Sequence, residues 1–168
     1  KTDSVIGMIV TDDFETSVLT ISKFGMAKRS RLGSGNMIPA LDENGAEVLD
    51  ESGEVTIERD GYRKTNRGTK GVRTMGLSEN DSIVSVRQIP DLEDQLFMLA
   101  KSGMMIRMPA SQTKETLGKV TKGTRIMELR GSDKKKYVDE IIFVARLPSE
   151  LIDDDAVEMD IEPSAEEE

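Results

Sequence analysis

One segment near the middle of the chain combines cations with glycines at close spacing. It reads Arg63-Lys64-Thr65-Asn66-Arg67-Gly68-Thr69-Lys70-Gly71-Val72-Arg73, with five cationic residues and two glycines among eleven. Glycine beside Arg or Lys lets backbone N–H groups approach a phosphate closely, while the cations neutralise the phosphate and release its counterions. No residue here specifies a base, so such a loop would position a nucleic acid without reading its sequence. A surface turn with solvated charges would show the same pattern, because K/R-G turns are common and no Walker motif is present.

The charge of the chain is unevenly distributed. The 168 residues hold 23 Lys and Arg against 32 Asp and Glu, a formal net charge of −9. Residues 151–168 contain nine acids and no base, and residues 36–61 contain eight acids and one base. The remainder holds 22 bases against 15 acids, a charge of +7. A basic body with two acidic appendages differs physically from a uniformly acidic protein. We expect the appendages to compete with an anionic partner for the basic surface.

The composition excludes most kinds of catalytic site. The chain has no His and no Cys, so it cannot build a thiol nucleophile, a His general base, a Cys/His zinc site or a disulfide. The remaining acid–base groups are carboxylates and lysines that form no distinguishable site. No apolar run approaches the roughly 20 residues that span a bilayer, and no signal-peptide core is present. We expect a soluble, intracellular protein without catalytic residues, bound metal or a membrane partner.

The sequence also repeats itself. Residues 22–26 (Ser-Lys-Phe-Gly-Met) recur at 100–104 as Ala-Lys-Ser-Gly-Met, an offset of 78. Residues 69–77 (Thr-Lys-Gly-Val-Arg-Thr-Met-Gly-Leu) recur at 121–129 as Thr-Lys-Gly-Thr-Arg-Ile-Met-Glu-Leu, an offset of 52. The two offsets differ by 26, which is the length of the acidic segment 36–61. A unit of about 50 residues is therefore present twice, a spacing typical of propeller blades and other repeat arrays.

Each unit has the pattern of four β-strands separated by Gly-containing or polar turns. The predicted strands are residues 18–22, 26–32, 72–77 and 82–89 in the first unit, and 95–100, 104–108, 124–129 and 137–147 in the second. Gly25 and Gly103 would supply the positive φ of two tight turns. The sequence therefore predicts an all-β array of four-stranded blades.

The strands define the expected domain organisation. Residues 1–17 are expected to end a preceding blade, 18–90 to form a blade with the acidic insertion, 91–150 to form a second blade, and 151–168 to be a disordered tail. Within residues 36–61, apolar residues alternate around a Gly turn and predict a small added hairpin. Two blades with open sheet edges would tend to associate.

The order of hairpin, basic Gly-rich loop and two further strands resembles the C-terminal domain of the DNA gyrase A subunit. The signature of that family, the gyrase box, is Gln-Arg-Arg-Gly-Gly-Lys-Gly, and residues 65–71 correspond to it. Four positions match (Arg67, Gly68, Lys70, Gly71), whereas Thr65, Asn66 and Thr69 depart. Residues 23–29 are similar to the family's Lys-Gly-x-x-Lys-Arg hairpin, and residues 117–123 look like a degraded second box. The resemblance covers about residues 4–147.

The resemblance implies a β-pinwheel, a propeller-like array of blades whose basic rim binds and bends double-stranded DNA. The box and its flanks would contact phosphates in the first blade, through Arg63, Lys64, Thr65, Asn66, Arg67, Gly68, Thr69, Lys70, Gly71 and Arg73. The track would extend along the hairpin and onto the next blade through Lys28, Arg29, Lys119, Lys122 and Arg125.

The resemblance also implies an activity for the whole enzyme. In gyrase this domain wraps the duplex, and the A and B subunits, as an A2B2 heterotetramer, introduce negative supercoils at the expense of ATP. The catalytic tyrosine, the ATP site and the Mg²⁺ ligands lie in other domains, and neither Tyr62 nor Tyr137 has the family's Arg-Tyr context. No cofactor is expected in these residues. The implied location is the bacterial cytoplasm, at the nucleoid.

Two alternatives remain open at this point. The A-type subunit of topoisomerase IV has the same blades with an eroded box, and the three departures in the box fit it as well. A protein-binding propeller fragment belongs to another class, and the +7 body argues against it. A salt titration of duplex binding separates these classes, because binding through phosphates weakens steeply with salt.

Overall fold

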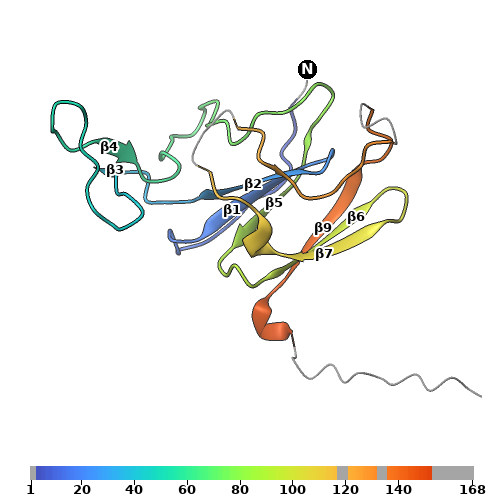
Figure 1. The fold of residues 1–168 in the computed structure, drawn as a ribbon. Coiled ribbons are helices and arrows are strands. Elements are labelled where there is room, and N and C mark those ends of the chain that lie inside the picture. The colour runs from blue at the N-terminus through green and yellow to red at the C-terminus, as the bar shows by residue number, and fades with distance from the viewer. Residues whose placement is uncertain (1–2, 117–120, 132–135, 153–168) are drawn as a thin grey trace, which may run out of the picture.

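The computed structural model describes residues 3–116, 121–131 and 136–152. These residues form three antiparallel sheets and two short 3-10 helices (Figure 1). The first sheet has the strand order β5-β1-β2-β8, the second β7-β6-β9, and the third pairs β3 with β4. The strands are β1 (Ser17–Ser22), β2 (Met26–Arg31), β3 (Met37–Pro39), β4 (Ile57–Arg59), β5 (Ile83–Ile89), β6 (Gln95–Ala100), β7 (Met105–Pro109), β8 (Thr124–Arg125) and β9 (Ile141–Leu147). The all-β prediction is confirmed. None of the described helices has the length and apolarity that a bilayer crossing requires.

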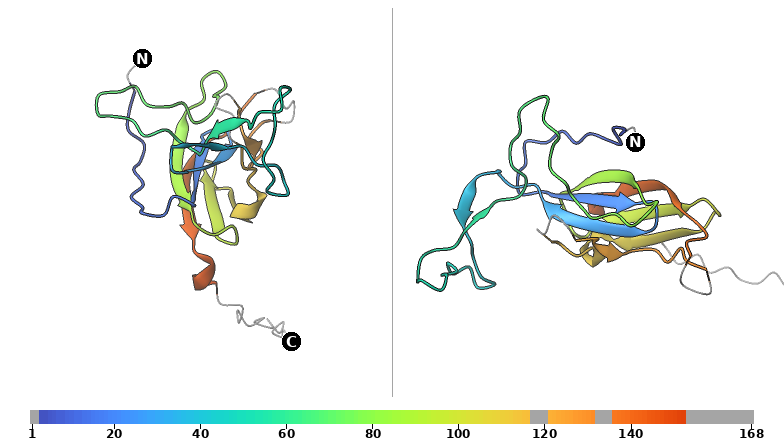
Figure 2. Two further views of the ribbon diagram at one scale, coloured as in Figure 1. Left: turned by 90° about the vertical axis from the view of Figure 1, so that its left-hand side faces the viewer. Right: turned by 90° about the horizontal axis from the view of Figure 1, so that it is seen from above.

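The two larger sheets stack as layers around one apolar core (Figure 2). In β6, buried residues alternate with half-exposed ones, as expected for a strand with one face in the core. The core cluster takes Leu19 and Ile21 from β1 and Leu96, Met98 and Ala100 from β6. The predicted hairpins of both units therefore form, and their apolar faces pack together.

The sheets interleave the two sequence units. Strand β8 belongs to the second unit by sequence, yet it pairs with β2 of the first unit, with Arg125 opposite Met26 and Thr124 opposite Ala27. The turn at Gly25 makes this close approach possible, because a Cβ there would lie 2.3 Å from the carbonyl oxygen of Met127. The structure thus differs from the expectation that each unit keeps its own four strands.

The predicted strand 72–77 and the expected end of a preceding blade form no strand in the described structure. Residues 72–77 form no strand, although they correspond by the repeat to the segment that contains β8. Residues 4–14 form none either; they run beside β5, where the Gln88 side chain donates a hydrogen bond to the Thr11 hydroxyl at 3.0 Å. The predicted tail from residue 153 onward lies outside the described residues.

The acidic insertion forms an arm that projects from the stacked sheets, at the left of Figure 1. Strands β3 and β4 make its stem, and the expected hairpin follows with Leu49 paired to Val55. At the base of the arm, the segments that enter and leave it approach so closely that a Cβ on Gly61 would lie 2.0 Å from the carbonyl oxygen of Leu32. The arm is therefore attached to the body through a narrow glycine-lined base.

Candidate nucleic-acid interface

The basic Gly-rich loop is on the surface. Residues 63–71 are all exposed. Gly68 and Gly71 both have positive φ (79° and 76°), and no atom lies within 4 Å of where a Cβ would sit on either. The Thr69 hydroxyl donates a hydrogen bond to the carbonyl oxygen of Asn66 at 3.0 Å. The glycines thus leave the backbone of this loop open to solvent.

The cations of this loop are not neutralised by neighbouring carboxylates. Within the described part of the chain, none of Arg63, Lys64, Arg67, Lys70 and Arg73 forms an ion pair. The Lys64 ammonium lies 5.9 Å from the ring centroid of Phe14, a cation–π contact that leaves its charge in place. Among the described residues, these five cations therefore give the loop a positive charge that no carboxylate offsets.

The two ends of the loop are tied together and to the first sheet. The hydroxyls of Tyr62, before the loop, and Thr74, after it, share a hydrogen bond of 2.5 Å. The Thr74 hydroxyl also lies 3.3 Å from that of Thr20 on β1, and the Lys28 ammonium donates to the Thr74 carbonyl oxygen at 2.6 Å. These contacts fix where the loop leaves and rejoins the body. Sequence reasoning missed Tyr62, Thr74 and Thr20, because the loop's own residues carry no sign of what anchors them.

Lys28 does not lie on the expected surface track. Lys28 is only 2% exposed, and burial lowers the pKa of its ammonium group below the usual 10.5. The structure therefore corrects its expected role: Lys28 supports the loop from below instead of facing a phosphate. The repeat contains the signal for this, because the counterpart of Lys28 at an offset of 78 is the apolar Ile106.

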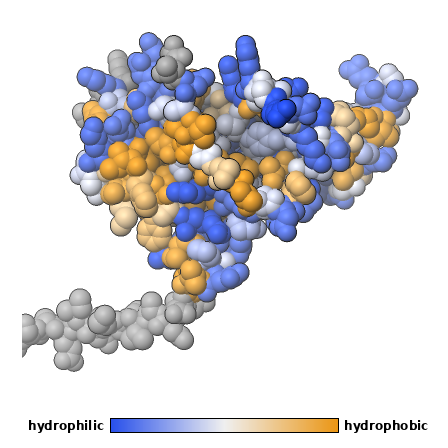
Figure 3. All heavy atoms as spheres, turned by 180° about the vertical axis from the view of Figure 1, so that it is seen from behind, coloured by the Kyte–Doolittle hydropathy of each residue, from blue (hydrophilic) through white to orange (hydrophobic). Residues whose placement is uncertain are grey.

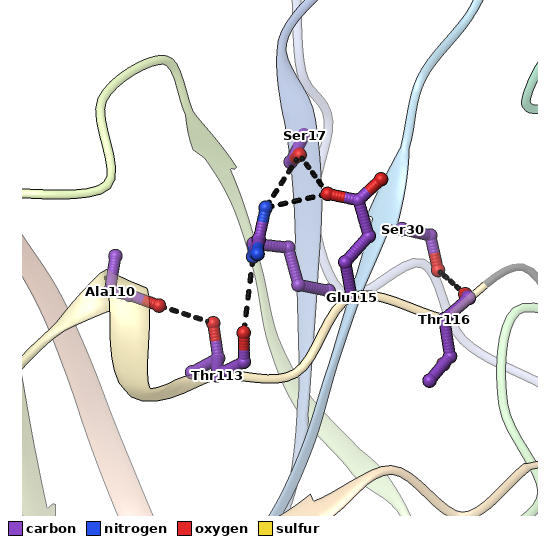
Figure 4. Close-up of polar contacts among 7 residues, drawn as sticks. Ser17, Ser30, Ala110, Thr113, Glu115 and Thr116 are labelled. Carbon is purple, nitrogen blue, oxygen red and sulfur yellow. Dashed lines mark hydrogen bonds and ion pairs between the residues drawn. The ribbon is translucent and has the colours of Figure 1, made fainter. Parts of the chain in front are cut away.

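Arg29 is also engaged within the protein. One of its guanidinium nitrogens donates to Glu115 at 2.6 Å and to Ser17 at 3.3 Å, and its Nε donates to the carbonyl oxygen of Thr113 at 3.2 Å (Figure 4). Its side chain is 11% exposed. Arg29 thus joins β2 to residues 113–116, which is a structural contact and not the expected surface contact.

The expected extension onto the second unit is less cationic than its sequence suggests. Arg125 forms an ion pair with Glu128 at 2.8 Å, and Arg130 pairs with the same carboxylate. Lys122 is exposed, and its neighbour Thr121 accepts a hydrogen bond from the Gly76 N–H at 3.0 Å. Lys122 therefore lies beside the chain that follows the basic loop. Lys119 falls outside the described residues.

The base of the acidic arm adjoins the start of the basic loop. A small pocket there is lined by Lys28, Arg31, Arg59, Tyr62 and Arg63. The guanidinium of Arg59 donates to the carbonyl oxygen of Gly35 at 2.7 Å, within the arm. The cations at the arm's base are thus partly used to hold the arm, whereas those of the loop are not.

Comparisons with known proteins agree with this architecture. A family model described as "DNA gyrase C-terminal domain, beta-propeller" matches residues 16–34, 57–90 and 94–147. The unmatched residues between the first two ranges fall within or next to the acidic insertion, as expected for an addition to a repeat.

Similar proteins include two DNA gyrase A subunits. That of Campylobacter fetus is 28% identical over 159 residues, covering 94% of this chain and 14% of that protein. That of Kosmotoga olearia is 37% identical over 73 residues, covering 43% of this chain and 9% of that protein. This chain therefore spans only a small part of the length of these relatives.

A solved structure shares the fold. The crystal structure of the C-terminal domain of DNA topoisomerase IV is 19% identical and superposes with a TM-score of 0.57, over 86% of this chain and 34% of that one. Because the family model matches both repeated units and the fold agrees, this chain belongs to the family of DNA gyrase C-terminal domains, which have a β-propeller fold.

Proposed function

We propose that this chain binds double-stranded DNA through the loop of residues 63–73 and bends it around the body. The observation that supports this most strongly is the set of five exposed cations that have no carboxylate partner in the described part of the chain, beside two glycines with open space around them. Arg63, Lys64, Arg67, Lys70 and Arg73 would neutralise phosphates, and the backbone N–H groups around Gly68 and Gly71 would donate to phosphate oxygens. Thr65, Asn66 and Thr69 would complete the same contact surface.

This mode of binding is independent of base sequence. The loop offers charge and backbone donors to phosphates, and none of its contacts requires a base edge. Lys122 and Arg125 would continue the contact along the second unit, with Arg125 sharing its charge with Glu128. We leave Lys28 and Arg29 out of the proposed interface because their side chains are buried or committed to internal partners.

For the whole protein we propose the role of a gyrase A subunit. The bound duplex would wrap around this region and be delivered to a strand-passing gate, so that an A2B2 enzyme could introduce negative supercoils in the bacterial cytoplasm. ATP and Mg²⁺ would act in other domains. The support is family membership together with relatives that are gyrase A subunits.

A topoisomerase IV subunit is the second candidate. The fold likeness to a topoisomerase IV C-terminal domain favours it, as do the three departures from the gyrase box. The two candidates differ in whether they wrap the duplex. Wrapping can be detected because it changes the linking number of a nicked circle that is resealed with the protein bound and then freed of protein.

That difference gives the test. We would incubate the 168-residue chain with nicked circular DNA, reseal it with ligase, and measure the linking number on a gel. We expect a shift that grows with protein concentration and disappears in the double variant Arg67→Ala, Lys70→Ala. The matched control Lys101→Ala, Arg107→Ala removes the same formal charge from two exposed positions, the turn after β6 and strand β7, and should keep the shift. Binding without any shift would favour the topoisomerase IV type, and no binding would refute the proposal.

A further inference from the structure

The small pocket at the base of the acidic arm is lined by positive side chains. Figure 3 shows the arm, at the right in this view from behind, as a lobe beside the body. The charged residues of the described chain that line the pocket are all cations: Lys28 and Arg31 on β2, Arg59 on β4, and Arg63 at the start of the basic loop. The volume of the pocket is about 40 Å³. Since one water needs about 10–15 Å³ by this measure, the pocket has room for about three oxygen atoms. It therefore has the charge and the size for a small anion.

The path of the chain brings two of these cations together from either side of a bend. Arg59 ends β4 and Arg63 begins the basic loop, with Gly61 between them. Gly61 has a positive φ of 64°, and a Cβ there would lie 2.0 Å from the carbonyl oxygen of Leu32. This conformation and this close approach both require glycine. The bend therefore lets the residues before and after it line the same pocket.

The same two arginines are not neutralised by carboxylates. In the part of the chain that the structure describes, neither Arg59 nor Arg63 forms an ion pair. Arg31, by contrast, is paired with Asp60 at 3.2 Å and with Glu15 at 2.7 Å. A guanidinium group has five N–H donors, and Arg59 gives one of them to a backbone carbonyl oxygen of the arm at 2.7 Å. The pocket thus keeps two positive charges that no described carboxylate offsets.

The wall that β2 gives to the pocket is polar where the second unit has apolar residues. Lys28 is 2% exposed and Ser30 is 4% exposed. Their counterparts 78 residues later, Ile106 and Met108, pack against the apolar core. Burying polar groups costs free energy, so a hairpin of this kind folds at lower cost with apolar residues at these positions. The hydrogen bond to Thr74 accounts for Lys28. It does not account for the two arginines that line the same pocket from other segments.

We propose that this pocket binds one phosphate group. Arg59 and Arg63 donate to its oxygens, because the planar guanidinium group matches a phosphate in both geometry and charge. Lys28 adds positive charge from β2, while its ammonium stays hydrogen-bonded to the Thr74 carbonyl oxygen. Burial lowers the pKa of this ammonium group, and an anion close to it would favour its charged form. The phosphate thus offsets the cost of burying this lysine and of gathering cations at one place.

Two sources offer this group: a free phosphate compound, and a backbone phosphate of a bound duplex. Only the second source rests on the proposed DNA binding. In either case the phosphate joins the arm, through Arg59, to the start of the basic loop, through Arg63. Inorganic phosphate should therefore slow amide hydrogen exchange in residues 59–63 and leave exchange in the outer arm, residues 41–54, unchanged. Protection confined to other residues would contradict the proposed site.

Titration with inorganic phosphate tests the site on the 168-residue chain. Calorimetry at constant ionic strength, set with sodium chloride, should show one saturable site per chain. Arg59→Gln and Arg63→Gln should each raise the dissociation constant at least about tenfold, because each removes a charge-assisted hydrogen bond. Arg63 is exposed and forms no ion pair with a described residue, so its variant should fold like the wild type. Lys64→Gln is the matched control, since it removes the same charge from the next residue, which does not line the pocket. No saturable binding, or an equal loss in Lys64→Gln and Arg63→Gln, overturns the proposal.

Adding a short duplex separates the two sources of phosphate, and it separates this site from the proposed DNA binding. Arg67→Ala, Lys70→Ala should lose duplex affinity and keep phosphate affinity, since neither residue lines the pocket. A duplex that releases bound phosphate from the wild type identifies a backbone phosphate as the occupant. A duplex that binds beside the phosphate identifies a free phosphate compound. Failure of duplex binding alone would refute the proposed function and leave the phosphate site supported. Loss of phosphate binding in Arg67→Ala, Lys70→Ala would place the anion on the loop and overturn the proposal.

Discussion

The Lys28 ammonium donates a hydrogen bond to the carbonyl oxygen of Thr74, at 2.6 Å, from a residue that is 2% exposed. This contact joins strand β2 to the chain that leaves the basic loop. A charged group is costly to bury unless it is hydrogen-bonded. The contact therefore helps to hold the basic loop on the first sheet. It also explains why Lys28, a lysine in a basic hairpin, does not face solvent.

Replacing Lys28 should affect stability more than DNA binding. Lys28→Met keeps the length of the side chain but leaves the Thr74 carbonyl without this donor, which should cost about 1–3 kcal/mol of unfolding free energy. Urea unfolding measures the loss. The salt dependence of duplex binding should stay as in the wild type. A salt slope reduced by about 0.9 would instead indicate a phosphate contact by Lys28.

Removing the Tyr62 hydroxyl should loosen the basic loop. Tyr62→Phe deletes the 2.5 Å hydrogen bond to Thr74 and keeps the ring in place. We expect a loss of about 0.5–1.5 kcal/mol in stability and faster amide hydrogen exchange in residues 63–73. Tyr137→Phe is the matched control, since Tyr137 lies in the second unit and its ring stacks on Phe24, away from the loop. Equal exchange in both variants would show that Tyr62 does not restrain the loop.

The base of the acidic arm should make stability depend on acid pH. The Ser34 N–H donates to the Asp60 carboxylate at 2.7 Å, and this bond, aided by nearby Arg31, lowers the pKa of Asp60 below 3.8. A carboxylate with a lowered pKa stabilises the fold above the pKa of the unfolded chain, and this contribution is lost as pH falls through the lower, folded value. Asp60→Asn should therefore flatten the loss of stability below pH 3.8. An unchanged pH profile would remove Asp60 from this account.

The outer part of the arm should be dispensable for folding. Residues 41–54 are all exposed, and Asp42 caps its own turn by accepting hydrogen bonds from Asn44 and Ala46. Replacing residues 40–56 with a Gly-Gly turn should change stability by no more than about 0.5 kcal/mol. It also removes six acids and no base, so duplex affinity should rise, most at low salt. If the variant and the wild type bound the duplex with equal affinity at low salt and also at high salt, the arm would not compete with DNA.

The features that could be predicted from the sequence are those that depend only on residues close together in the chain. The hairpin turn at Gly25, the hairpin strands of both units and the exposed basic loop follow from local patterns, and the structure contains them, whereas the predicted strand 72–77 does not form. The pairing of β8 with β2 could not be predicted, because a two-residue strand has no periodicity and its partner is about 100 residues away. The burial of Lys28 depends on Thr74, which the loop brings back across β2. Contacts between distant segments decided both cases.

The salt dependence of duplex binding tests the central claim most directly. We would measure the dissociation constant of the 168-residue chain and a short duplex by fluorescence anisotropy over a range of salt concentrations. Arg67→Ala, Lys70→Ala should weaken binding equally on duplexes of different sequence and reduce the log–log salt slope by about 1.8, or 0.9 for each lost phosphate contact. The control Lys101→Ala, Arg107→Ala, which removes the same charge, should keep the wild-type slope. Equal slopes in the loop variant and the wild type would contradict the assignment of DNA binding to this loop.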